Sequence, residues 1–213
     1  RNVELTDKTD AEWQKAFALY QGLDEAKAVE DAGAALRFLQ QHPACTGKVG
    51  TVGFCLGGKL AYLLAVRYHP DCSVGYYGVG IESALDEVAN LRQPLMLHIA
   101  QQDKYCPPEA QARLHAAMAA NPLVTLHDYA GRDHAFVRNN GIHFNAEAAE
   151  LLQSHHELAG VAVTLIGQLG NLPEGPSLEE VQMHDLPLFG RESAQRVCQR
   201  DAVLLRQRRA ACD

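Results

Sequence analysis

The sequence predicts an α/β fold in which a mostly parallel sheet is flanked by helices. Short apolar runs alternate with longer amphipathic segments, and polar or glycine-rich loops follow the apolar runs. Such alternation is typical of β-α units joined by right-handed crossovers. A length of 213 residues suits one domain, and a hydrophobic content of 47% is enough for a substantial core.

Each expected element follows from its own pattern. The first helix, 10–21, carries Trp13, Phe17 and Tyr20 on one face, and an aromatic face of this kind is more often core than binding site. The later elements are expected, in chain order, at helix 24–41, strand 48–53, helix 57–69, strand 73–77, short helix 82–90, strand 94–100, helix 108–120, strand 122–129 and a helix from about 144.

The segment Gly53-Phe-Cys55-Leu-Gly57 joins a predicted strand to a predicted helix and carries a cysteine at its apex. Glycines two positions either side of the apex let strand and helix approach closely, while the strained apical residue lifts its side chain out of the sheet. The following helix N-terminus offers free N–H groups to a developing oxyanion and acidifies a thiol placed there. The alternative is that the glycines only pack helix on strand and Cys55 is a core thiol.

Two later loops supply partners for such a nucleophile. Asp103 follows strand 94–100, and His134 follows strand 122–129. Nucleophile, acid and histidine in this order are typical of the catalytic triad of α/β-hydrolases. Asp133 is the rival acid because it neighbours His134, but Asp103 is preferred because no strand directly precedes Asp133.

Four segments resemble the dienelactone hydrolase (carboxymethylenebutenolidase) family: 47–58, 75–80, 102–103 and 133–134. The resemblance extends from about residue 9 to about residue 150. It implies the α/β-hydrolase fold, with Cys55 as nucleophile, Asp103 and His134 completing the triad, and the Leu56 N–H in the oxyanion hole.

The resemblance also suggests substrate-binding residues. Arg138 is similar to a family arginine that binds the substrate carboxylate, although from the sequence alone a solvated loop charge is the simpler interpretation. The first helix would border the substrate pocket, so Trp13 and Phe17 are expected to bind substrate. Tyr77, in the segment 75–80 that resembles the family, is also expected to bind it. The family has a second carboxylate-binding arginine close to where Trp13 stands, and its absence leaves the native substrate open.

Both chain ends depart from the family pattern. The chain begins at Arg1, so the resemblance implies that the family's N-terminal strands are missing, and we expect strand 48–53 to have an unpaired edge. We expect residues 1–170 to form the N-terminally truncated hydrolase domain. Residues 171–213 form a divergent tail, expected to be poorly ordered or the start of another segment, with out-of-frame translation as a further alternative.

Composition excludes several classes of partner. A net charge of −7 argues against nucleic acid, and the apolar stretch 158–169 is too short to span a bilayer. The six cysteines show no ligand spacing and are expected to be free thiols in a reducing compartment, and His155 and His156 point about 100° apart on a helix. We therefore expect a cytoplasmic monomer with no metal site, no cofactor and no membrane partner.

These observations predict a hydrolase that cleaves lactones or activated esters through a thioester on Cys55, as in the degradation of aromatic compounds. Its partner would be a small-molecule lactone or ester. The alternatives are a general carboxylesterase acting on uncharged esters and a truncated fragment without catalysis.

Overall fold

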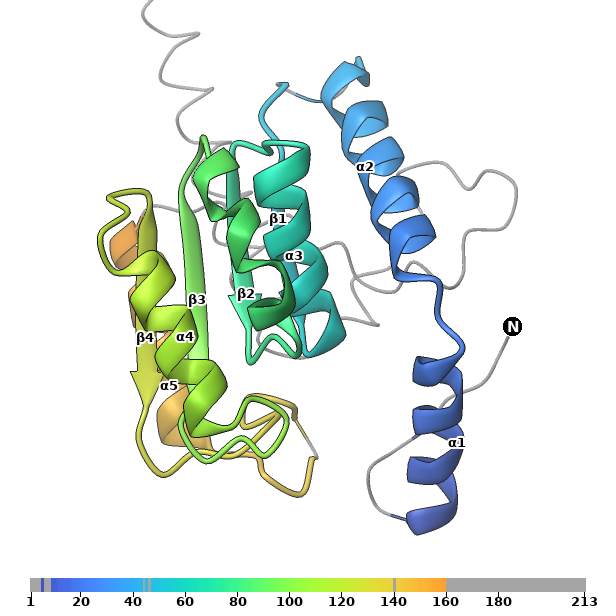
Figure 1. Cartoon of the computed structure of the whole chain (residues 1–213), viewed down its shortest axis with the longest axis vertical. Coiled ribbons are helices and arrows are strands. Elements are labelled where there is room, and N and C mark those ends of the chain that lie inside the picture. The colour runs from blue at the N-terminus through green and yellow to red at the C-terminus, as the bar shows by residue number, and fades with distance from the viewer. Residues whose placement is uncertain (1–4, 6–8, 44, 46, 140, 160–213) are drawn as a thin grey trace, which may run out of the picture.

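The structure, a computed structural model, describes residues 5, 9–43, 45, 47–139 and 141–159. Its centre is a parallel sheet of four strands in the order β1-β2-β3-β4, with helices on both faces (Figure 1). The predicted class of fold is therefore confirmed. The tail predicted at 171–213 lies outside the described residues.

The elements alternate along the chain as expected, each within a few residues of its predicted bounds. The strands are β1 (Gly50–Phe54), β2 (Cys72–Tyr76), β3 (Leu95–Ala100) and β4 (Val124–Tyr129). The helices are α1 (Asp10–Gln21), α2 (Glu25–Gln41), α3 (Leu56–Arg67), the 3-10 helix η1 (Ile81–Asn90), α4 (Pro108–Met118) and α5 (Ala146–Ala159).

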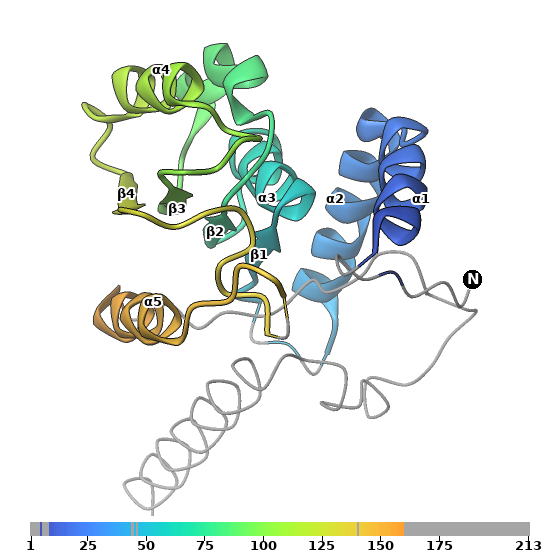
Figure 2. The same ribbon diagram turned by 90° about the horizontal axis from the view of Figure 1, so that it is seen from below.

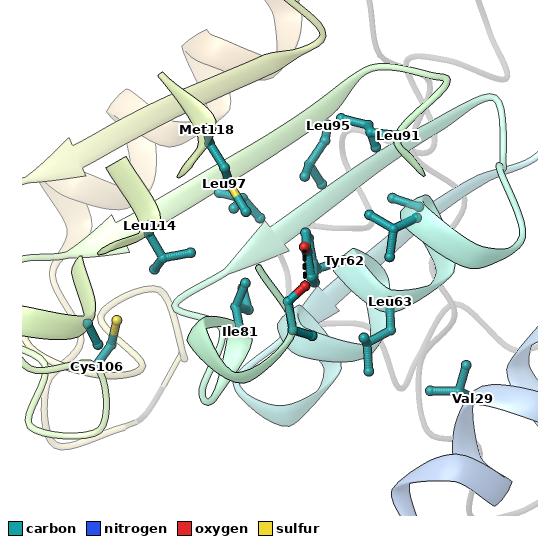
Figure 3. Packing of buried hydrophobic residues seen from close by; sticks show 14 residues of the cluster. Val29, Tyr62, Leu63, Ile81, Leu91, Leu95, Leu97, Cys106, Leu114 and Met118 are labelled. Carbon is teal, nitrogen blue, oxygen red and sulfur yellow. Dashed lines mark hydrogen bonds between the residues drawn. The ribbon is translucent and has the colours of Figure 1, made fainter. Parts of the chain in front are cut away.

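The helices form two layers around the sheet. Helices α3, η1 and α4 cover one face, and α5 covers the other (Figure 2). Figure 3 shows the apolar cluster on the first face, where Tyr62 of α3 is fully buried and its hydroxyl donates to the Ala84 carbonyl at 2.8 Å. This hydrogen bond satisfies the buried phenol, so α3 and η1 are joined by both packing and polar contact.

Helix α3 packs on the sheet through glycines. A Cβ atom on Gly53 would lie 1.8 Å from the Gly57 carbonyl oxygen, and one on Gly58 would lie 2.8 Å from the Tyr76 carbonyl oxygen. Only glycine fits these two positions without moving the backbone. Gly57 differs, because a Cβ there would meet no atom within 4 Å. The expectation that both flanking glycines serve close approach is therefore right for Gly53 and wrong for Gly57.

A stack of four rings crosses the sheet on the face toward α5. Phe54, Tyr76, His98 and His127 occupy equivalent register positions on the four strands. Their successive centroids are 4.5, 4.7 and 5.2 Å apart, with interplanar angles of 10°, 7° and 17°. Cross-strand ring pairs of this kind stabilise register. The stack lies just before the loops that leave the carboxyl ends of β1 and β2, so it supports the site built there.

Helix α1 lies apart from the sheet, beyond α2 (Figure 1). None of its residues is buried, and Trp13, Phe17 and Tyr20 are each about two-fifths exposed. The expectation that this aromatic face belongs to the core is wrong, since helical periodicity identifies a face but not what covers it. At the sheet, β1 is an outer strand, and no described strand pairs with its outer edge.

Candidate active site

Cys55 occupies the sharp turn between β1 and α3. Its backbone has φ 56° and ψ −119°, a strained conformation for a residue with a side chain. Two hydrogen bonds hold the turn: the Cys55 N–H donates to the Tyr76 carbonyl at 3.0 Å, and the Cys55 carbonyl accepts from the Gly58 N–H at 2.9 Å. The thiol is half-buried, so it is both held and accessible.

Helix α3 begins directly after this turn, with Cys55 as its N-terminal capping residue and Leu56 as its first residue. The N–H groups of a first helical turn have no partner within the helix, and they carry the positive end of the helix dipole. The Cys55 side chain makes no capping hydrogen bond. The thiol therefore lies beside the part of a helix that best stabilises negative charge.

Asp103 lies in the loop after β3, and its side chain is only 1% exposed. One carboxylate oxygen, Oδ2, is 2.7 Å from His134 Nδ1, and the other, Oδ1, accepts the Tyr105 backbone N–H at 2.8 Å. Both oxygens of this buried carboxylate are therefore engaged, as a buried charge requires.

His134 joins the acid to the thiol. Burial lowers the pKa of His134, but hydrogen bonds with Asp103 and Cys55, and the charges of both groups, outweigh burial and raise it to about 9. The imidazolium is therefore the favoured form at neutral pH. The protonated ring is hydrogen-bonded to both Asp103 and Cys55.

The two candidate acids make different contacts with His134. Asp133 directs Oδ1 to the His134 backbone N–H at 2.6 Å, and its Oδ2 is 3.7 Å from His143 Nε2. It shapes the loop and does not hold the His134 ring nitrogen. A hydrogen bond from the Gln102 N–H to the Arg132 carbonyl, 2.8 Å long, ties the acid loop to the histidine loop.

Tyr77 lies beside His134 in this site. It is buried and has φ 37°, another left-handed backbone, and its ring centroid is 5.0 Å from that of His134. Burial holds the pKa of the Tyr77 phenol far above its usual range, the charge of Cys55 raises it further, and the charge of Arg138 lowers it. Tyr77 therefore stays protonated at neutral pH.

The other expected substrate-binding residues are less closely placed. Arg138 is exposed, and its guanidinium donates to the Leu5 carbonyl at 3.4 Å. Trp13 makes a ring contact with Tyr105, with centroids 6.0 Å apart. Phe17 stacks on Tyr20 in the exposed face of α1, so its described ring contact lies outside the site.

Tyr105 is a residue that the sequence patterns missed. Its ring meets His134 edge to face, with centroids 5.0 Å apart and an interplanar angle of 76°. The available signal was its position two residues after Asp103, in the same loop. The stack of Phe54, Tyr76, His98 and His127 was missed as well, although its members lie near the ends of the predicted strands.

Two other cysteines, Cys72 and Cys106, lie in environments that disfavour the thiolate. Burial raises the pKa of Cys106 to about 12, helped by the charges of Glu82 and Asp103, and burial also raises the pKa of Cys72. Both remain thiols at neutral pH.

Among the described residues, no group of three or more histidine, cysteine or acidic side chains could hold a metal ion. None of the described helices has the length and apolarity needed to cross a bilayer.

The parallel sheet, the strained turn before α3 and the partners on the next loops together define an α/β-hydrolase. The chain belongs to the dienelactone hydrolase family, whose model matches residues 1–156. This match confirms the family that the sequence motifs resemble.

Three relatives and one solved structure illustrate the similarity. A protein of Azospirillum brasilense is 42% identical over 159 residues, covering 70% of this chain and 64% of its own length. A carboxymethylenebutenolidase of Pseudomonas putida is 37% identical, covering 69% of this chain and 62% of its own length. Carboxymethylenebutenolidase 1 of Cupriavidus pinatubonensis is 35% identical with the same coverage.

A dienelactone hydrolase-like promiscuous phosphotriesterase from metagenomic libraries matches with a TM-score of 0.59 and 19% identity, covering 71% of this chain and 67% of that one. At this identity the likeness concerns the fold. The chain spans less than two thirds of the length of the first two relatives it matches.

Proposed function

We propose that the protein hydrolyses lactones or activated esters through Cys55, with His134 as general base and acid and Asp103 as the group that orients the imidazole. The observation that carries this proposal is the chain of contacts from the buried Asp103 carboxylate through His134 to the thiol. This arrangement supports nucleophilic catalysis because Asp103 orients the imidazole of His134, and His134 in turn activates the thiol of Cys55.

The reaction has two steps. The Cys55 thiolate attacks the ester carbonyl carbon, and the developing oxyanion is stabilised at the start of α3, where the Leu56 N–H is the proposed donor. The carbon–oxygen bond breaks, His134 gives its proton to the leaving oxygen, and the acyl group stays on Cys55 as a thioester. Water then gives a proton to His134 and attacks the thioester, which releases a carboxylic acid and restores the thiolate.

Thiolate chemistry restricts the substrate class. A thiolate leaves a tetrahedral intermediate readily, so the leaving oxygen must also leave readily, as it does in enol esters and lactones. An amide nitrogen leaves poorly, so amides are poor substrates. Arg138 is the residue that we propose binds a substrate carboxylate, because it follows His134 by four residues in the same loop. We infer that such a lactone, of the kind formed when aromatic compounds are degraded, is the substrate.

A general esterase for uncharged esters is the second candidate. It is supported by the aromatic surroundings of the site, where the rings of Tyr77 and Tyr105 contact His134 and Trp13 contacts Tyr105. The two candidates differ in whether activity depends on Arg138. We further propose that residues 1–170 carry the catalysis and that the protein acts as a cytoplasmic monomer, where the four described cysteines, all free, would stay reduced.

Labelling of the thiols tests the nucleophile. The complete gene product is treated briefly with iodoacetamide at pH 7, and the labelled cysteine is identified by mass spectrometry. Cys55 is expected to react first, and Cys72 and Cys106 late, because burial keeps both of them as thiols. An activated ester should acylate Cys55 and prevent its alkylation. Acylation at Cys45 with Cys55 untouched would remove Cys55 from the mechanism.

A further inference from the structure

The imidazole of His134 is contacted by two tyrosine rings from different loops. Tyr77 follows β2 and Tyr105 follows β3, and each ring centroid lies 5.0 Å from the centroid of His134. The interplanar angles are 65° and 76°, so both contacts are close to perpendicular. This geometry and distance are favourable for aromatic pairs, and they restrict how the imidazole can turn.

Tyr105 has a second connection to the same machinery. Its backbone N–H donates to Asp103 Oδ1 at 2.8 Å, while Asp103 Oδ2 holds His134 Nδ1 at 2.7 Å. One residue thus contacts the acid through its backbone and the imidazole through its ring.

The hydrogen bond that His134 donates to Asp103 does not by itself fix the imidazole. It restrains Nδ1, but the ring can still swing about that bond, and this swing moves Nε2 away from the thiol. A misplacement of about 1 Å at a reacting group can cost a factor of about 10² in rate. A second contact, to the face or edge of the imidazole, is therefore needed to fix its orientation.

We propose that Tyr105 is the positioning residue that does this: its ring holds the His134 imidazole in the orientation that joins Asp103 to Cys55. This inference rests on the proposed hydrolytic function of the site. Tyr105 does not exchange protons or touch the reacting carbonyl in this role. It acts on the reaction only through His134.

The Tyr105 ring makes two further contacts. The indole of Trp13 lies 6.0 Å from it, and the Lys104 ammonium lies 5.0 Å from its centroid, within reach of a cation–π contact. These contacts link the exposed helix α1 to His134 through Tyr105. Replacing Trp13 should therefore have the same effect as replacing Tyr105, but a weaker one.

Substitution at Tyr105 separates the ring from the backbone. Tyr105→Ala, Tyr105→Leu and Tyr105→Phe all keep the N–H that holds Asp103, and only Tyr105→Phe keeps an aromatic ring. In the complete gene product, Tyr105→Ala and Tyr105→Leu should lower kcat for p-nitrophenyl acetate by about 10- to 100-fold with KM nearly unchanged. Tyr105→Phe should stay within about twofold of the wild type, because ring contact and not the hydroxyl is required.

The rate of Cys55 alkylation by iodoacetamide at pH 7 provides a readout that does not need turnover. It should fall in Tyr105→Ala and Tyr105→Leu and stay unchanged in Tyr105→Phe, because a displaced imidazolium no longer favours the thiolate. If the Tyr105 ring only shielded Cys55 from the reagent, its removal would instead make alkylation faster. Phe38→Ala, which removes an exposed ring from α2, is the matched control and should change neither rate.

Three results would overturn the inference. A raised KM with unchanged kcat would make Tyr105 a wall of the substrate pocket. Faster or unchanged alkylation in Tyr105→Ala would mean that the ring does not position His134. A lower melting temperature with wild-type kcat per labelled Cys55 would make it a packing residue. By contrast, a wild-type protein that alkylates at Cys55 but turns over no ester would contradict the proposed function and leave the alkylation comparison valid.

Discussion

Replacing Asp103 by asparagine should lower activity strongly, because the new amide cannot keep both hydrogen bonds of the carboxylate. The carboxylate accepts one hydrogen bond on each oxygen, from His134 at Oδ2 and from Tyr105 at Oδ1. An asparagine amide has one acceptor and one donor group, so it can satisfy only one of these two donors.

Both orientations of the new amide are unfavourable. If its oxygen faces His134, its NH₂ group opposes the Tyr105 N–H, and an unsatisfied buried donor costs about 1–3 kcal/mol. If its NH₂ group faces Nδ1, the imidazole proton moves to Nε2, and this tautomer cannot take the proton of Cys55. In both orientations the negative charge that supports the imidazolium is lost.

Loss of the Asp103 carboxylate should also change the pKa of His134. The pKa of His134 is lowered by burial and raised to about 9 by its hydrogen bonds with Asp103 and Cys55. Without the carboxylate, burial is less strongly opposed and the pKa of His134 falls, so the imidazolium is lost at a lower pH. Alkylation of Cys55 at pH 7 should therefore slow, because the imidazolium beside it is lost.

The expected decrease in kcat for Asp103→Asn is about 10²- to 10⁴-fold, measured with p-nitrophenyl acetate and the complete gene product. Asp133→Asn is the matched control. Its new amide oxygen can still accept the His134 backbone N–H, now 2.6 Å from Asp133 Oδ1, so activity should change by less than about threefold. Normal turnover in Asp103→Asn together with inactive Asp133→Asn would refute the reasoning.

Two further predictions concern packing and substrate charge. Gly53→Ala should lower the free energy of unfolding by about 3 kcal/mol, because its Cβ would lie 1.8 Å from the Gly57 carbonyl oxygen, whereas Gly57→Ala should change it by less than about 1 kcal/mol. Urea denaturation of the two variants checks this, and equal effects would contradict it. Arg138→Ala should raise KM for a carboxylate-bearing lactone by about 10- to 100-fold and leave p-nitrophenyl acetate hydrolysis nearly unchanged. Equal effects on both substrates would make Arg138 a structural residue, and no effect on either would favour the uncharged-ester function.

Much of the fold follows from local patterns. The alternation of strand and helix, the turn at Cys55 and the loops that carry Asp103 and His134 were all predicted within a few residues. These features depend on the period of the hydrophobic residues, on the positions of glycines and on the order of the elements along the chain. All of these can be read from residues that are close together in the sequence. The direct packing of Gly53 on Gly57 belongs to the same local geometry.

Other features depended on where distant segments meet. The face of α1 that carries Trp13 and Phe17 has the spacing of a core helix, yet the helix buries none of its residues. The same spacing is compatible with either outcome, because periodicity describes only the helix itself. What covers a face is decided by the path of the chain before and after it.

The sequence by itself determined the kind of residues available for the chemistry and the order in which they occur. Only the tertiary structure decided that Asp103 and not Asp133 holds the His134 ring, and that Tyr105 lies against the same imidazole. The physical reason is that Asp103 and His134 follow adjacent strands, and the register of β3 on β4 brings their loops together across 31 residues of sequence. No local pattern encodes that register, since it arises from the packing of the whole sheet against its helices.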